Sequence, residues 1–272
     1  MVRLVATDLD GTLLRSDGTI SNRTRVALQQ ATESGVVVVL VTGRPPHTLR
    51  KAAEAAGVSG LAICSNGAVI YDLDQPGIVR HTALEVETAA RLIHALRAAV
   101  PEVCFAFVRG ERFACEQAYF DLSEARDQAD GYLDLAVLGE ALALCDEAPT
   151  KLIARHASIS ADELLAMVHA LGLDGFEATH SGAPFVEVAA AGVTKARALE
   201  ALCTDLGIHA GEVVAFGDAP NDLPLLRWAG RSVAVANAHP HLLAEAHEIA
   251  PANDDDGVAV VLERLLAARA ST

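Results

Sequence analysis

The chain has 272 residues, of which 51% are hydrophobic and 21% charged, so it can bury the core of one large domain or of two modest ones. Its formal net charge of −15, with no stripe of basic residues, argues against binding to nucleic acid or to an anionic membrane surface. Five cysteines without a CxxC pair indicate neither a disulfide framework nor a zinc site.

The first expected elements alternate between strand and helix. The apolar segment 2–7 predicts a strand that is buried on both faces. A helix is expected over 21–35, which begins at a serine N-cap and ends at a glycine. The branched aliphatic run 36–41 predicts a central parallel strand, and the helix expected over 45–57 has a proline in its first turn. This alternation is typical of a doubly wound parallel sheet.

Between residues 82 and 188 the alternation stops. The expected elements there are a helix at 86–99, strands at 103–108, 112–115 and 151–156, a helix at 161–171 and a strand at 185–188. Their order is typical of an α+β domain. Because the sequence on both sides follows one rhythm, we expect this domain to be inserted into a loop of the other.

The alternation resumes after residue 189. Helices are expected at 195–206, 222–228 and 257–268, and strands at 213–216 and 232–235. We therefore predict an α/β protein. Its core, residues 1–81 and 189–272, would be a Rossmann-like doubly wound parallel sheet, and residues 82–188 would form the inserted α+β domain.

Two acidic residues, Asp8 and Asp10, directly follow the first predicted strand. Residues two apart on an extended backbone point the same way, so both carboxylates can converge at the sheet edge where open α/β sheets bind ligands. They could act as nucleophile and general acid/base, or bind a hard cation. The segment could also be a simple acidic turn. A calcium loop is disfavoured because Leu9 and Leu13 stand where oxygen ligands are needed.

Two further segments offer groups that could bind an anion. Thr42, Gly43 and Arg44 lie between a strand and a helix, where a hydroxyl and backbone N–H groups can face a negative ligand, although a plain turn has the same composition. Lys195 begins a helix and supplies an ammonium suited to a phosphoryl oxygen, although isolated lysines are more often solvated. The sequence has no GxxxxGK[ST] or GxGxxG motif, which argues against nucleoside-triphosphate and dinucleotide sites.

A third predicted strand end carries two acids and an amide: Asp218, Asn221 and Asp222. Asp218 could bind a divalent cation together with Asp8, and Asn221 and Asp222 could support it by hydrogen bonds. An ordinary turn would explain the composition of this segment. It would not explain why acids recur at two strand ends, and this recurrence favours a functional site.

Six motifs, in their order and spacing, resemble the haloacid dehalogenase (HAD) superfamily of phosphotransferases, and within it the Cof-type, sugar-phosphatase-like hydrolases. They are DLDGTLL at 8–14, TGRP at 42–45, SNGA at 65–68, GVTKARAL at 192–199, GDAPND at 217–222 and NDDDGVA at 253–259. The resemblance covers nearly the whole chain. Ala196, and the pair Ala219-Pro220, depart from residues that are commoner in the family, but neither departure removes a catalytic group.

The resemblance implies a magnesium-dependent phosphatase that forms an aspartyl-phosphate. Asp8 would be the nucleophile, and Asp10 would protonate the leaving alcohol and then activate water. The residues implied in phosphate or substrate binding are Thr42, Gly43, Arg44, Asn66, Lys195 and Asn221. Mg²⁺ would be held by Asp8, the Asp10 carbonyl and Asp218, with Asp222 in support.

The spacing of the motifs also bears on the inserted domain. One helix separates Leu14 from Thr42, whereas the stretch from Thr42 to Lys195 holds the whole insertion. The resemblance therefore implies a class 2, α/β (C2B-type) cap that selects substrates. Candidate specificity residues are Arg109, Lys151 and 180–182, although each could be a spectator.

The expected substrates are small phosphorylated metabolites. Sugar phosphates are the default, and pyridoxal phosphate, a flavin-precursor phosphate or a phosphoglycerate derivative are alternatives. A phosphomutase-like phosphotransferase and a non-catalytic sugar-phosphate sensor are the alternative functions. We expect a cytoplasmic monomer or weak homodimer without nucleic acid or membrane partners, because acidic residues come before any signal-like segment and no apolar run reaches membrane-spanning length.

Overall fold

The computed structural model describes residues 1–123 and 136–270. The chain divides into two compact units, one formed by residues 1–79 and 194–272 and the other by residues 80–193. The second unit extends slightly beyond the predicted insertion at both ends. The predicted α/β fold, with a parallel core sheet and additional strands and helices, is confirmed.

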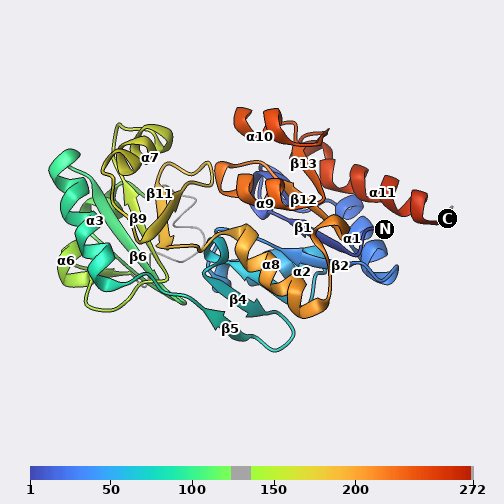
Figure 1. Cartoon of the computed structure of the whole chain (residues 1–272), viewed down its shortest axis with the longest axis horizontal. Helices are drawn as coiled ribbons and strands as arrows, with labels where there is room; N and C mark the ends of the chain where they lie inside the picture. The colour runs from blue at the N-terminus through green and yellow to red at the C-terminus, as the bar shows by residue number, and fades with distance from the viewer. Residues whose placement is uncertain (124–135, 271–272) are drawn as a thin grey trace. The chain divides into compact units, whose positions relative to one another are not determined.

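The first unit is built on a five-stranded parallel sheet (Figure 1). Its strands, in spatial order, are β14 (Glu248–Ala250), β13 (Arg231–Val235), β12 (Val213–Gly217), β1 (Leu4–Thr7) and β2 (Val37–Leu40). β1 pairs with β2 on one side and with β12 on the other, and the strand order reverses between β1 and β12. Such a reversal is where open α/β sheets bind ligands at the carboxyl ends of their strands.

Helices cover both faces of this sheet. They are α1 (Asn22–Glu33), α2 (Pro46–Ala56), α8 (Lys195–Leu206), α9 (Leu223–Trp228), α10 (Pro240–Glu245) and α11 (Gly257–Ala270). Successive side chains of β1 enter opposite clusters. Val5 lies in the cluster formed by α1, α2 and α11, whereas Leu4 and Ala6 lie in the one formed by α8 and α9. Burial on both faces explains the continuous apolar run of this strand.

A small second sheet, whose third strand continues past the end of the first unit at residue 79, has no counterpart among the predicted elements. It consists of β3 (Leu61–Cys64), β4 (Val69–Asp72) and β5 (Gly77–His81). β3 and β4 are antiparallel and are joined by the turn Ser65–Gly67. The Thr42 N–H donates to the Ile63 carbonyl at 2.8 Å, which brings this turn close to the end of β2.

The second unit has a six-stranded sheet. The spatial order is β10 (Phe176–Thr179), β11 (Val186–Ala190), β9 (Lys151–Arg155), β6 (Cys104–Arg109), β7 (Arg112–Cys115) and β8 (Val137–Leu138). All neighbouring pairs are antiparallel except β7 with β8. The helices in the described part of this unit are α3 (Val86–Ala99), α4 (Gln117–Asp121), α6 (Ala141–Leu144) and α7 (Ala161–Ala170). A core around Phe105 and Phe107 packs under α3 and α7.

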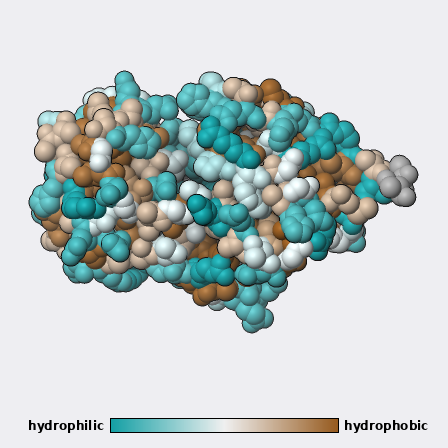
Figure 2. All heavy atoms as spheres, in the orientation of Figure 1, coloured by the Kyte–Doolittle hydropathy of each residue, from teal (hydrophilic) through white to brown (hydrophobic). Residues whose placement is uncertain are grey.

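The visible surface is mixed in hydropathy. Hydrophilic residues are spread over the visible face, with apolar residues interspersed among them (Figure 2). Among the residues described, none of the helices combines the length and apolar character that a membrane span requires.

Candidate active site

Three neighbouring strands of the parallel sheet end in the predicted site residues. Asp8 follows β1, Thr42 lies just beyond β2, and Asp218 follows β12. Because β1 lies between the other two strands, their carboxyl ends meet at one edge of the sheet. The sheet topology therefore gathers residues that lie far apart in the sequence.

Lys195 is the centre of the buried polar network at this edge. It is the first residue of α8, and its side chain is completely buried. Its Nζ donates to Asp8 Oδ1 at 2.6 Å and to Asp222 Oδ1 at 2.7 Å. A buried ammonium without such partners would be strongly unfavourable, so the two carboxylates fix its position.

The pKa of Lys195 is set by the same two contacts. Burial alone would lower the pKa of its ammonium, but the negative charges of Asp222 and Asp8 outweigh this effect and raise the pKa above its ordinary value. Lys195 is therefore a permanent cation at neutral pH.

Asp222 shapes the loop that follows β12. Its Oδ2 accepts hydrogen bonds from the N–H groups of Asp218 and Ala219, each at 3.1 Å. Gly217 must lack a side chain, because a Cβ there would lie 2.5 Å from the Cβ of Asp222. The Asp222 side chain thus holds the backbone of the loop that contains it. These contacts fix Asp218 and also place the Asp222 carboxylate, which binds Lys195.

Asp218 faces the loop after β1. Its Oδ1 accepts the Thr12 hydroxyl at 2.6 Å. Gly11 has φ +76°, and a Cβ on it would lie 2.5 Å from Asp218 Oδ2, so this close approach requires glycine. Burial and the nearby charge of Asp222 raise the pKa of Asp218 to about 7, and the Thr12 hydrogen bond only partly opposes the rise.

The Asp10 carboxylate is paired with Arg44. Both of its oxygens accept from Arg44, with Nε to Oδ2 and Nη2 to Oδ1 each at 2.7 Å. Arg44 in turn is tied to the end of β2, because its backbone N–H donates to the Thr42 hydroxyl at 3.0 Å. Arg44, which the sequence suggested as a substrate-binding residue, here holds Asp10 by a bidentate pair.

Asn66 and Asn221 form a buried amide pair beside the site. Asn221 Nδ2 donates to Asn66 Oδ1 at 3.0 Å. Asn221 Oδ1 is buried and has no hydrogen-bond partner in the described part of the chain. Asn66 has φ +57° and lies in the turn between β3 and β4. Its backbone N–H donates to the Thr42 carbonyl at 3.0 Å. Asn66 is thus fixed beside Thr42, and Asn221 beside Asn66.

The predicted site residues therefore fall into two groups. Asp8, Asp218 and Asp222 offer carboxylate oxygens that all lie within 4.8 Å of one another, whereas the Asp10 carboxylate pairs with Arg44. Thr12 was not singled out in the sequence, although its place just after Asp8 and Asp10 in the same motif could have indicated a site role.

Comparison with known proteins identifies the family. A family model described as haloacid dehalogenase-like hydrolase matches residues 5–262. The chain belongs to the haloacid dehalogenase-like hydrolases. Relatives of this HAD family include Phosphatase YwpJ of Bacillus subtilis, which is 27% identical over 97% of this chain and 100% of its own. A second B. subtilis relative, 5-amino-6-(5-phospho-D-ribitylamino)uracil phosphatase YcsE, is 29% identical over 95% of this chain and 93% of its own.

A solved structure has the same fold. The crystal structure of a Streptococcus mutans protein superimposes with a TM-score of 0.84 at 25% identity, and the match covers 98% of this chain and 100% of that one. The similarity extends over both units. The chain as a whole therefore has the fold of that solved structure.

HAD hydrolases generally use a divalent metal, and the acids of this site fit one. Asp8 Oδ2 and Asp218 Oδ2 accept no hydrogen bond from any described residue, whereas both oxygens of Asp222 are occupied. Burial raises the pKa of Asp8 well above its ordinary value against the attraction of Lys195, and the charges of Asp222, Asp218 and Asp10 add to the rise. The site has an excess of negative charge and two free hard oxygens, which suit a hard cation.

Proposed function

We propose that this enzyme, a phosphoric monoester hydrolase of the HAD family, hydrolyses small phosphorylated metabolites through a covalent intermediate on Asp8. The proposal rests chiefly on one observation. Lys195 fixes Asp8 through Oδ1 while Asp8 Oδ2 has no partner among the described residues. A carboxylate held by one oxygen, with the other free and a permanent cation beside it, suits nucleophilic attack on a phosphoryl group.

In the first step Asp8 Oδ2 forms a bond to phosphorus, and the bond from phosphorus to the leaving alcohol oxygen breaks. Asp10 gives its proton to that oxygen, so a neutral alcohol leaves. Lys195 stabilises the negative charge that develops on the transferring group. The bidentate contact with Arg44 favours the ionised form of Asp10, so this contact would have to open and Asp10 take up a proton from solvent before the transfer.

In the second step water attacks the phosphorus of the aspartyl-phosphate. Asp10, now ionised, takes a proton from the water, and the bond between phosphorus and Asp8 breaks to release inorganic phosphate. Mg²⁺, bound by Asp8 and Asp218, would neutralise the repulsion between the carboxylates and the phosphate dianion. Thr42, Gly43 and the Asn66–Asn221 pair would contact the phosphate or the substrate.

The identity of the substrate is a second part of the proposal. We propose sugar phosphates or phosphorylated polyols, and the ribityl phosphate named for the relative YcsE is one such compound. The second unit, residues 80–193, would select the leaving group. A panel of phosphorylated metabolites, assayed for inorganic phosphate in the presence of Mg²⁺, tests this proposal.

We also propose that the protein is cytoplasmic and is a monomer or weak homodimer. Size-exclusion chromatography with light scattering would test the oligomeric state.

The nucleophile is tested by Asp8→Asn. We expect this variant to fold, to show a smaller rise of melting temperature with Mg²⁺, and to release no measurable phosphate, because an amide cannot attack phosphorus. Asp205→Asn, an exposed acid near the end of α8, is the matched control and should retain wild-type turnover. Phosphate release by Asp8→Asn at the wild-type rate would refute the proposed mechanism.

A phosphomutase-like transfer is the alternative within the same chemistry. It requires that the phosphorylated enzyme pass its phosphoryl group to a second site on the product. Steady release of inorganic phosphate without any added bisphosphate would exclude it. Dependence of turnover on a bisphosphate would favour it.

A further inference from the structure

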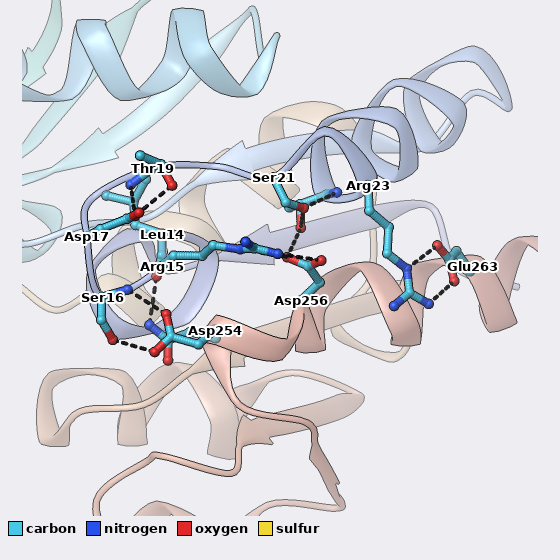
Figure 3. A network of polar contacts seen from close by, with 12 residues as sticks. Leu14, Arg15, Ser16, Asp17, Thr19, Ser21, Arg23, Asp254, Asp256 and Glu263 are labelled. Carbon is cyan, nitrogen blue, oxygen red and sulfur yellow. Dashed lines mark hydrogen bonds and ion pairs between the residues drawn. The ribbon is translucent and has the colours of Figure 1, made fainter.

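The last sequence motif, NDDDGVA, contains no residue of the site just described. Its first four residues, 253–256, lie against the segment 11–16, through which the chain leaves the nucleophile (Figure 3). The two segments are joined by side-chain hydrogen bonds and by an ion pair. We call these contacts, together with the hydrogen bond from Asn237 to Gly11, the loop clamp.

Two asparagines form the inner part of the loop clamp. Asn237 Nδ2 donates to the Gly11 carbonyl at 2.7 Å, and Asn253 Nδ2 donates to the Leu14 carbonyl at 2.9 Å. The Asn253 backbone N–H donates to Asn237 Oδ1 at 3.0 Å, so the two amides support each other. Both contacts are to backbone carbonyls, and they therefore constrain the path of the loop rather than one side chain.

The outer part of the loop clamp is charged. Arg15 makes a bidentate contact with Asp256, with Nη2 at 2.8 and 2.9 Å from the two carboxylate oxygens (Figure 3). Ser16 donates to Asp254 through its backbone N–H at 2.8 Å and through its hydroxyl at 2.7 Å. Burial alone would raise the pKa of Asp256, but hydrogen bonds from Ser21 and Arg15 outweigh it and lower the pKa. The contact with Arg15 is therefore ionic at neutral pH.

The clamped carbonyls lie directly beside the catalytic acids. The loop turns sharply at Gly11, immediately after Asp10, and Gly11 lies in tight contact with Asp218. The next residue, Thr12, donates to Asp218 Oδ1. A shift of the loop would therefore move Asp10 and Asp218 together, and displacements of about 1 Å in catalytic groups cost about a hundredfold in rate.

We propose that Asn237 and Asn253 are positioning residues of the reaction, which hold the loop after Asp8 in its reactive path, and that the Arg15–Asp256 pair supports them from outside. This inference rests on the proposed function. The asparagines touch neither the phosphate site nor the acids, and they act through the carbonyls of Gly11 and Leu14. Asn237 follows β13 and Asn253 follows β14, so both side chains reach the loop from other parts of the chain.

The test is steady-state kinetics of Asn253→Ala and Asn237→Ala with p-nitrophenyl phosphate and Mg²⁺. Each variant should lose about 10–100-fold in kcat, with KM within about threefold of wild type, because groups that orient catalytic residues have effects of this size. The double variant should be little worse than either single one, since both residues act on one loop. The matched control is Glu263→Gln, which breaks a bidentate pair with Arg23 between α1 and α11 and leaves the loop alone (Figure 3). It should keep kcat within about twofold.

Each result distinguishes this inference from the proposed function. If wild type and Glu263→Gln hydrolyse the phosphoester and Asn253→Ala keeps its kcat, the clamp is refuted and the phosphatase assignment stands. If wild type releases no phosphate from any ester, the proposed function itself fails. Should an alanine variant not fold, Arg15→Lys preserves the charge but loses the bidentate geometry, and a wild-type kcat in this variant would refute the outer support.

Discussion

Two of the three lysines in this chain are buried, and their surroundings differ. Lys195 in the first unit bonds to acids from two separate segments, Asp8 after β1 and Asp222 after β12. Lys151 in the second unit pairs with Glu187 on β11, the strand next to its own, and Glu187 Oε2 has no partner among the described residues. The comparison separates two uses of a buried lysine.

The difference lies in how the charges balance. Around Lys195 the carboxylates outnumber the ammonium, because Asp218 stands beside Asp8 and Asp222. Such an excess of charge is costly in a protein interior and becomes favourable when a cation or a reaction uses it. The Lys151–Glu187 contact itself joins one cation with one anion, and Lys151 has a further interaction besides it. A pair of this kind holds two strands in register and needs no ligand to be neutral.

The largest expected effect is that of Lys195→Met. It should reduce phosphate release by at least about a thousandfold, because the cation beside the nucleophile is lost. It should also lower the free energy of unfolding by about 3–5 kcal/mol, since two buried carboxylates lose their partner. Urea denaturation and a phosphate assay measure the two effects. Lys51→Met, at an exposed position of α2, is the control. Equal phosphate release and equal stability in the two variants would show that Lys195 has neither role.

A smaller effect, confined to stability, is expected for Lys151→Met. It should cost about 3–5 kcal/mol of unfolding free energy, because Glu187 remains buried without its cation. The double variant Lys151→Met/Glu187→Leu should recover most of this loss, since two apolar residues need no partners. Turnover at saturating substrate should stay close to wild type in the double variant if the pair serves only the fold. A thousandfold loss of kcat there would place Lys151 with Lys195 as a catalytic lysine.

The smallest effect concerns an ion-pair network at the surface. Glu248 contacts Arg231 and Arg264. Burial alone would raise the pKa of Glu248, but hydrogen bonds from Arg264 and Arg231 outweigh it and lower the pKa. Because the folded protein holds this carboxylate ionised, its stabilisation is complete above the ordinary pKa of about 4.5 and is lost as the pH falls below that value.

Glu248→Gln should therefore be less stable than wild type by about 1 kcal/mol at pH 7 and equally stable near pH 3. Denaturation curves at several pH values measure this difference. Glu54→Gln, at an exposed position of α2, is the reference for the loss of one surface carboxylate. A constant difference between wild type and Glu248→Gln at every pH would mean that the charge of Glu248 is not its source.

Much of the fold could be predicted from local sequence. The apolar runs of β1 and β2 are buried on both faces, and the glycines after α2 and α8 adopt left-handed conformations that end these helices. The prediction of a central strand at 36–41 was wrong, because β2 is the last strand of the five-stranded sheet and, in the described part of the chain, only a bridge between Val41 and Ile63 lies beyond it. The small sheet β3–β5 escaped prediction. Its strands are short, and the turn between β3 and β4 requires positive φ angles at Ser65 and Asn66. No residue pattern in the sequence predicts these angles.

The sequence by itself determined which acids follow which strands, because a buried parallel strand and the polar loop after it are both local features. It also placed Lys195 at the first turn of a helix. Only the tertiary structure decided which of these charges meet. Three sets of contacts depend on strands brought together across the sheet. Lys195 binds Asp222 as well as Asp8, and Asp10 pairs with Arg44. Asn237 and Asn253 donate hydrogen bonds to the loop after Asp8. Contacts between residues far apart in the chain are set by packing, and packing cannot be read from any one segment.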